Sequence, residues 1–190
     1  MSTHTYFIGF TGSLRKHSVN QGVLRAVQQL LPAEVRMEIL SLDMLPHYNM
    51  DLEDDEPEAV RRFKEKLSRA DALFIATPEF NGSTPGVLKN ALDWVSRPFG
   101  RSVLAGKPVA LTGAGGRGGT ASAQAHLRHM FTRFGVAIPV LTQPEVYIAN
   151  AWEKFDDQGN LKDTATREQL RDLLQALLEA VEAQKRAMVA

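Results

Sequence analysis

The sequence contains no cysteine. This absence excludes disulfide bonds, thiolate nucleophiles, CxxC redox motifs and zinc sites built on thiolates. Any redox chemistry must therefore come from a bound cofactor. The chain also lacks an apolar run of about 18 residues, the length of a membrane-spanning helix, and its start lacks the basic and apolar pattern of a secretory signal. We expect a cytoplasmic protein that does not associate with membranes.

An excess of charge of one sign is also missing. The 22 basic and 22 acidic residues cancel, so the chain lacks the positive field with which most nucleic-acid-binding proteins attract phosphate backbones. Repeats and low-complexity segments are absent, and the hydrophobic fraction of 44% is typical of soluble domains. We predict a single domain over residues 1–190 that has no nucleic-acid partner.

Short apolar runs alternate with amphipathic segments along the chain. We expect strands at residues 6–10, 35–42, 72–76 and 109–112, with the last strand material at 136–140 and 146–148. We expect helices over 23–31, 57–67, 85–95, 127–134 and 166–181, with Pro57 and Pro85 in first turns and with Thr166 and Gln169 at capping-box spacing.

This alternation predicts an α/β fold with right-handed crossovers between parallel strands. The units match a flavodoxin-like three-layer sandwich, in which a five-stranded parallel sheet of order 2-1-3-4-5 has helices on both faces. Ligands of such sheets bind outside the carboxyl ends of the strands, where the strand order reverses. Three loops at that edge are therefore candidates for a binding site.

The first loop, residues 12–20, leads from a buried strand into a helix start, which stabilises phosphate through free backbone N–H groups. Ser13, Ser18 and Asn20 add short polar groups, and Arg15 adds a charge-assisted contact. The loop lacks the GxxxxGK[ST] pattern of a nucleoside-triphosphate P-loop. An alternative is that Ser18 or Asn20 only caps the helix and that Arg15 is solvated.

The second loop, residues 78–86, contains two prolines and two glycines around Phe80. It is stiff, and backbone N–H groups of residues 81–83 are candidate donors to a flavin ring on which Phe80 packs. Alternatively, the loop is only a rigid turn and Phe80 belongs to the core.

The third loop, residues 113–120, contains a formal GxGxxG match. The match follows the fourth strand instead of the first, so it is weak support for a dinucleotide site. The glycines, Gly115 among them, more plausibly let the backbone approach the pyrimidine edge and ribityl chain of a flavin. Arg117 is a candidate to face the flavin carbonyls or the nicotinamide nucleotide.

Together these motifs resemble the NADPH-dependent FMN reductases, particularly the bacterial quinone and chromate reductases of flavodoxin-like fold. The resemblance covers roughly residues 5–180. It rests on Gly12-Ser13-Leu14-Arg15-Lys16 with Ser18 and Asn20, on Pro78-Glu79-Phe80-Asn81 through Pro85-Gly86, on Lys89-Asn90-Ala91 with Asp93-Trp94, on Lys107-Pro108 and Gly115-Gly116, and on Phe155-Asp156 with Gly159.

The resemblance implies two groups of cofactor-binding residues. The FMN phosphate binds Ser13, Arg15, Ser18 and Asn20, and the isoalloxazine is lined by Pro78, Glu79, Phe80, Asn81, Gly82 and Ser83. Val19, Gly115 and Arg117 complete the predicted set. Phe80 replaces the tyrosine usual in the family, and His17 stands where a small or acidic residue is common.

The implied activity passes hydride from NADPH or NADH through FMN N5 to a small acceptor, a quinone or a metal oxyanion such as chromate. No side chain need act as an acid or base, so we predict no catalytic residue. The resemblance also implies dimers or tetramers, in which Arg128 and Glu145 look like the charged residues that cross the subunit interface of relatives; the alternative is a solvated ion pair, or no pair, within the chain. Two other classes stay open, an electron carrier and a flavin-binding sensor; the balanced charge disfavours the usually acidic carriers.

Other chemistry finds less support. His126 and His129 are three residues apart, but no nearby carboxylate completes a metal site, and we expect a surface or interface pair. The acidic run at 51–56 reads as a solvated loop, and residues 45–50 before it are candidates for packing on another subunit. A GxSxG elbow, which would indicate an α/β-hydrolase, is absent.

Overall fold

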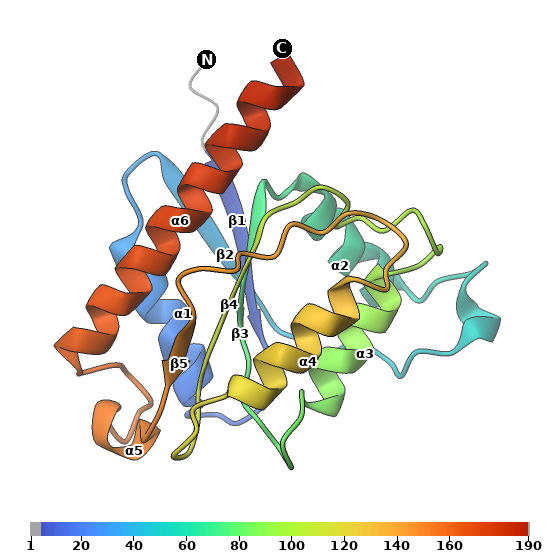
Figure 1. Ribbon diagram of the computed structural model, residues 1–190. Helices are drawn as coiled ribbons and strands as arrows, with labels where there is room; N and C mark the ends of the chain where they lie inside the picture. The colour runs from blue at the N-terminus through green and yellow to red at the C-terminus, as the bar shows by residue number, and fades with distance from the viewer. Residues whose placement is uncertain (1–4, 190) are drawn as a thin grey trace.

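The fold is built on one parallel sheet. The computed structural model describes residues 5–189, and its five strands run in the order β2-β1-β3-β4-β5 (Figure 1). This order confirms the predicted flavodoxin-like architecture. The strands are β1 (Thr5–Thr11), β2 (Val35–Leu40), β3 (Ala72–Ala76), β4 (Val109–Ala114) and β5 (Val146–Ile148).

Helices cover both faces of the sheet, as expected. On one face lie α1 (Val19–Leu30), the short α5 (Ala151–Lys154) and α6 (Thr164–Val189); on the other lie α2 (Glu58–Arg69), α3 (Gly86–Val95) and α4 (Ala121–Phe131) (Figure 1). In the described part of the chain, no helix combines the length and apolarity that crossing a bilayer requires.

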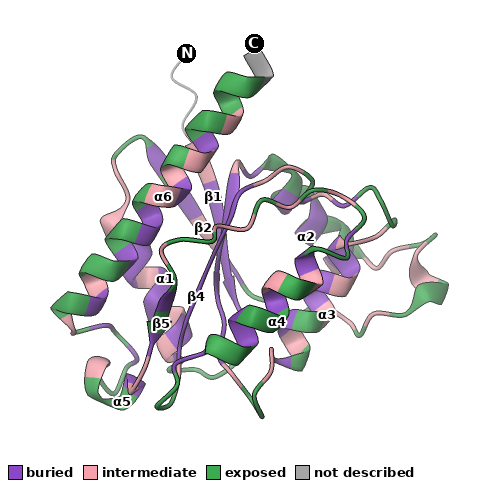
Figure 2. Ribbon diagram, viewed as in Figure 1, coloured by how far each residue is buried: buried purple, intermediate pink, exposed green. Residues whose placement is uncertain are grey.

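The hydrophobic core consists of two clusters, one on each side of the sheet. Phe7 and Phe74 point to the side of α1 and α6, whereas Phe10 and Ile75 point to the side of α2, α3 and α4. All five residues of β3 are buried, which fits a central strand covered on both faces. Figure 2 shows the sheet as buried and the outer helix faces as exposed. Because successive side chains of a buried strand point to opposite faces, such apolar runs hold a helix layer on each side of the sheet.

The strand order reverses at β1, which pairs with β2 on one side and with β3 on the other. Thr11 at the end of β1 is in register with Ala76 at the end of β3, and Ala76 is in register with Thr112 of β4. Because all strands are parallel, the loops that follow β1, β3 and β4 emerge at the same edge. These are the three loops that the sequence indicates.

Several predicted boundaries were wrong. Residues 136–140 form no strand; only Val140 makes a bridge, to Val109, and Pro139 beside it has no N–H for a ladder. Strand β4 extends two residues beyond its predicted end, through Ala114, because these residues pair with β5. Helix α4 ends at Phe131, before the predicted Phe134.

Three helix starts also differ. Pro57 and Pro85 occupy the N-cap positions of α2 and α3 and not their first turns. Helix α6 begins at Thr164, and the side chain of Asp163 accepts hydrogen bonds from the backbone N–H (2.8 Å) and hydroxyl (2.5 Å) of Thr166. The predicted cap at Thr166 was therefore wrong. Its hydroxyl satisfies Asp163 from inside the first turn.

The segment between β2 and α2 extends away from the body of the molecule and contains the short 3-10 helix η1 (Met50–Leu52) (Figure 1). Asp51, Asp54 and Asp55 are exposed there, as a solvated acidic loop predicts, whereas Glu53 and Glu56 are partly buried and pair with Arg97 and Lys64.

Candidate cofactor site

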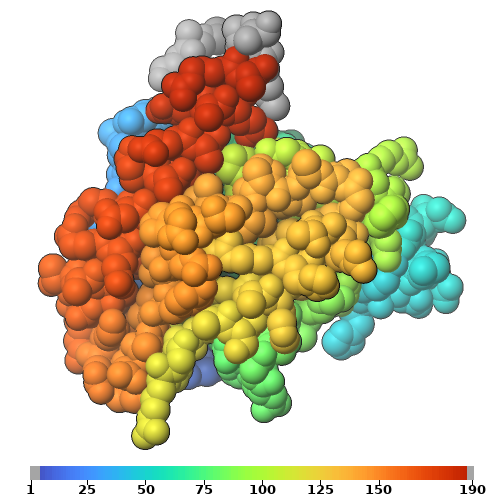
Figure 3. Space-filling model, viewed as in Figure 1, coloured from blue at the N-terminus to red at the C-terminus, as the bar shows by residue number. Residues whose placement is uncertain are grey.

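A cleft of about 560 Å³ lies at the carboxyl edge of the sheet, within the range of small-molecule sites. The tips of the second and third loops project from this edge in Figure 3, in green and yellow. Three loops and the α5 region line the cleft: Ser13, Arg15, His17, Ser18, Val19, Asn20, Pro78, Glu79, Phe80, Ala114, Gly115, Gly116, Ala151, Trp152, Phe155, Asp156 and Asp157.

The first loop ends in a capped helix start. Ser18 is the N-cap of α1, and its hydroxyl oxygen accepts a hydrogen bond from the backbone N–H of Gln21 at 3.3 Å. The first turn of α1 contains no acidic residue, so the partial positive charge of the helix end is not offset. Arg15 is exposed at the cleft wall. The arrangement can stabilise a phosphate group.

Asn20 ties this loop to the sheet. Its amide nitrogen donates to the carbonyl oxygen of Ala114 (2.9 Å), and its amide oxygen accepts from the N–H of Ala114 (2.8 Å). The side chain is 1% exposed, so both bonds are shielded from water. Of the two residues that the sequence offers as helix caps, Ser18 takes that role and Asn20 holds the loop to the end of β4.

The second loop forms a tight hairpin at residues 80–83. Phe80 and Ser83 exchange two backbone hydrogen bonds of 3.1 Å. The two residues between them, Asn81 and Gly82, have φ values of 53° and 69°. Positive φ at both central residues is the geometry of a type I′ hairpin turn. Phe80 is 56% exposed. The alternative interpretation of Phe80 as a core residue is therefore wrong, and its ring is free to contact a ligand.

Two side chains of this loop reach helix α4. The carboxylate of Glu79 accepts a hydrogen bond from the backbone N–H of Ala123 at 2.9 Å. Thr120, the N-cap of α4, makes no side-chain capping bond, so Glu79 supplies the acceptor for the helix start from a different loop. The hydroxyl of Ser83 lies 3.0 Å from Nδ1 of His126.

The third loop is glycine-rich for reasons of packing. A Cβ atom on Gly113 would lie 2.0 Å from the carbonyl oxygen of Thr77, and one on Gly115 would lie 2.4 Å from that of Gly119. Gly119 has a φ of 63°. Glycine is therefore required at Gly113, Gly115 and Gly119 by the backbone itself, which accounts for the first two glycines of the formal GxGxxG pattern without a dinucleotide; a Cβ atom on its third glycine, Gly118, would meet no other atom within 4 Å. The backbone of Gly115 still forms part of the cleft wall.

A fourth wall comes from the α5 region, to which sequence reasoning assigned no role. The N–H groups of Asn150 and Ala151 donate to the carbonyls of Gly116 and Gly115, both at 3.0 Å. These bonds fix α5 against the third loop and place Trp152, which is 62% exposed, at the cleft. Phe155 and Asp156 carry part of the family resemblance, so their motif gave a signal; Trp152 gave none.

The turn after α5 packs against the start of α1. A Cβ atom on Gly22 would lie 1.7 Å from the carbonyl oxygen of Gly159, so the two backbones are in direct contact. The carboxylate of Asp156 closes this turn by accepting from the N–H groups of Asn160 (2.7 Å) and Gln158 (3.0 Å). The Asn160 bond is the main cause that holds the pKa of Asp156 below its ordinary value.

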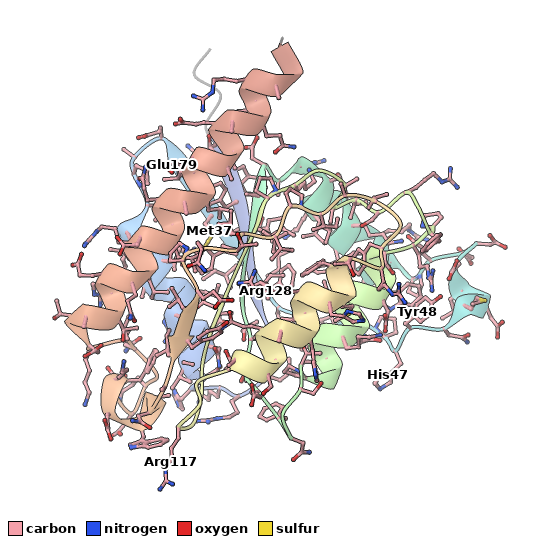
Figure 4. All side chains as sticks on the ribbon, viewed as in Figure 1. Met37, His47, Tyr48, Arg117, Arg128 and Glu179 are labelled. Carbon is pink, nitrogen blue, oxygen red and sulfur yellow. The ribbon has the colours of Figure 1, made fainter. Side chains whose placement is uncertain are left out.

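The predicted cofactor residues fall into two groups. The cleft brings together Ser13, Arg15, Ser18, Val19, Asn20, Pro78, Glu79, Phe80 and Gly115. Outside its lining are Asn81, Gly82, Ser83 and Arg117. Figure 4 shows Arg117 at the outer tip of the third loop, directed away from the body of the molecule. The roles of all these residues toward a cofactor stay predictions.

The other charged candidates lie away from the cleft. Arg128, in the last turn of α4, pairs with Glu145 within this chain at 3.9 Å (Figure 4). Among residues 5–189, no three His, Cys, Asp or Glu side chains are grouped so as to hold a metal ion.

Known proteins resemble this chain over most of its length. The family described as NADPH-dependent FMN reductase matches residues 5–153. A NAD(P)H-dependent FMN reductase of Pseudomonas aeruginosa is 44% identical, covering 93% of this chain and 95% of the relative. A 2-hydroxy-1,4-benzoquinone reductase of a Burkholderia species is 42% identical, with coverages of 86% and 88%.

A solved structure agrees. The flavoenzyme NAD(P)H:(acceptor) oxidoreductase of Paracoccus denitrificans superposes with a TM-score of 0.82 at 34% identity, covering 95% of this chain and 98% of that one. The chain belongs to the family of NADPH-dependent FMN reductases, as the resemblance implies, and is an oxidoreductase that uses FMN with NAD(P)H as the electron donor.

Proposed function

We propose that the protein is an FMN-dependent NAD(P)H:quinone oxidoreductase and that FMN binds in the cleft at the carboxyl edge of the sheet. One observation carries the proposal: a single cleft joins the capped start of α1 to the hairpin containing Phe80 and to the glycine-rich backbone after β4. A phosphate with a flat ring attached needs a polar helix start for the phosphate beside a flat wall for the ring, which the hairpin and the backbone after β4 provide.

The chain's own groups fit FMN. The start of α1, with Ser13, Ser18 and Arg15, holds the phosphate through N–H groups, hydroxyls and a guanidinium. Phe80 and Pro78 give an apolar wall for the isoalloxazine, and the backbone at Gly115 approaches it without an intervening side chain. Trp152 adds a second exposed aromatic face.

Bound FMN would supply two-electron chemistry between NAD(P)H, as the hydride donor to N5, and the quinone, whose reduction to quinol also takes up a proton from solvent. The protein's contribution is to orient the ring and leave one face of it open. No residue of the cleft has to move a proton for this transfer, so the proposal assigns binding residues and no acid or base.

The preferred acceptor is a quinone. Both the Burkholderia relative and other members bear names of quinone reductases. The proposal also includes chromate as an acceptor, which we expect to be reduced more slowly because the names of these relatives point to quinones.

We also propose that the protein is a cytoplasmic homodimer or homotetramer. The exposed apolar side chains of Met44 and Met50, both in the segment between β2 and α2, support a buried interface, since exposed large apolar side chains often mark one.

The test is NAD(P)H oxidation by the FMN-loaded protein with a quinone acceptor, preceded by the visible spectrum of the purified protein. We expect a yellow protein that oxidises NADPH or NADH and reduces the quinone faster than chromate. Flavin binding without turnover of either nucleotide would instead support an electron carrier or a sensor. A colourless protein that takes up no added FMN would overturn the proposal.

A further inference from the structure

The tip of the second loop has little to hold it. Asn81 and Gly82 are exposed, and a Cβ atom on Gly82 would meet no other atom within 4 Å. The backbone bonds between Phe80 and Ser83 close the hairpin but do not attach it to the rest of the molecule. Its attachment depends on the residues on either side of the tip.

Both of these attachments lead to α4. Glu79, just before the hairpin, accepts from the N–H of Ala123, and Ser83, at its other end, contacts Nδ1 of His126 at 3.0 Å. The first contact is to a backbone N–H in the first turn of α4, and the second is to a side chain three residues further along the helix. The hairpin is therefore held to the N-terminal half of α4 at two points.

Helix α4 is a firm support for such contacts. Leu127 and Phe131 are buried in the core on the opposite side of the helix from solvent, and the side chain of Gln124 donates to the carbonyl of Val146 in β5 at 3.1 Å. A hairpin bound to α4 therefore takes its position from the sheet and core.

We propose that His126 is a positioning residue for the flavin-lining hairpin: its hydrogen bond with Ser83 holds Phe80 in place against the cofactor. The inference rests on the proposed function, since it assumes that FMN occupies the cleft. The proposal gives His126 a role that His129 does not share, although the sequence analysis treats the two histidines as a pair. His129 follows on the same helix and is exposed.

The test compares FMN affinity across variants by flavin fluorescence titration. His126→Ala removes the contact, and we expect FMN to dissociate about five- to tenfold more readily, as the loss of one hydrogen bond implies. His126→Asn places an amide near the position of Nδ1, and we expect it to restore most of the affinity. His129→Ala is the matched control, the same substitution one turn along the helix, and should leave affinity unchanged.

A double-mutant cycle with Ser83→Ala separates positioning from a general effect on the helix. If the bond is responsible, the double variant should bind FMN no more weakly than either single variant. The visible absorption band of bound FMN should also shift in His126→Ala and return in His126→Asn. Thermal unfolding of the FMN-free variants should match that of the wild type.

The outcomes are distinguishable. A wild-type protein that binds no FMN overturns both the proposed function and this inference. A wild-type protein that binds FMN, with His126→Ala no weaker than His129→Ala, overturns the inference alone. Losses in Ser83→Ala and His126→Ala that simply add would also overturn it, because the two side chains would then act independently.

Discussion

The first loop and the hairpin of the second loop face the same cleft but are held in different ways. The first loop is fixed from within the fold: Asn20 is buried against β4, and Gly22 touches the turn at Gly159. The hairpin is exposed at its tip and is held by side chains that reach α4. We infer that changes at the buried contacts of the first loop affect folding and binding together, whereas changes in the hairpin or at exposed side chains of the first loop affect binding alone.

The largest effect should follow from Asn20→Ala. The substitution leaves the N–H and carbonyl of Ala114 without partners in a buried position, and each such loss costs about 1–3 kcal/mol. We expect the free energy of unfolding to fall by about 2–4 kcal/mol, measured by urea denaturation of the FMN-free protein. A stability within about 0.5 kcal/mol of the wild type, the range of surface substitutions, would show that Asn20 does not hold the loop.

Gly22→Ala should come next. Its Cβ atom would lie 1.7 Å from the carbonyl oxygen of Gly159, a backbone atom that cannot move aside without shifting the turn. We expect a loss of about 1–3 kcal/mol, the usual cost of overpacking, by the same measurement. The matched control is Gly86→Ala, also in a helix, where a Cβ atom meets nothing within 4 Å and stability should be kept. Equal effects of the two substitutions would argue against contact between the turn and α1.

Arg15→Ala tests the part of the first loop that does not support the fold. The side chain is exposed, and its hydrogen bond to the carbonyl of His17 is 3.4 Å long. We expect unchanged stability and a loss of FMN affinity of about tenfold or more, because a charged hydrogen bond to phosphate contributes about 1.5–3 kcal/mol. Flavin fluorescence titration measures it, with Lys16→Ala as the control. Unchanged affinity would mean that Arg15 does not contact the phosphate.

The sequence predicts those elements whose position depends on residues that are neighbours in the chain. The continuous apolar run at Ala72–Ala76 identifies β3 to the residue, and the motif at residues 12–20 identifies a capped helix start. It fails where a distant partner decides. Val136 and Ile138 are typical of a strand, but the segment bridges β4 at one residue only.

The same distinction applies to the candidate site. Short polar residues and glycines mark the three loops in the sequence. Nothing in the sequence shows that Glu79 reaches Ala123 or that His126 reaches Ser83, because the partners are 44 and 43 residues apart along the chain. Trp152 enters the cleft only because α5 bonds to the backbone of Gly115 and Gly116. Such contacts can be identified only once the order and direction of the strands and helices are known.

The smallest effect concerns Asp156, which supports the first loop from outside through the turn at Gly159. Its pKa in the folded protein is lowered, chiefly by the N–H of Asn160. Because the pKa of Asp156 is lower in the folded than in the unfolded protein, its charge stabilises the fold at pH values above the unfolded pKa of about 3.9. This contribution is lost as pH falls through the pKa of the folded protein.

Asp156→Asn keeps an acceptor but removes the charge. We expect the variant to unfold slightly more easily than the wild type at pH 7, and the gap to narrow near pH 3 in thermal unfolding followed by circular dichroism. A gap of the same size at both pH values would contradict the assignment, because the charge of Asp156 would then contribute nothing to the turn that backs the first loop.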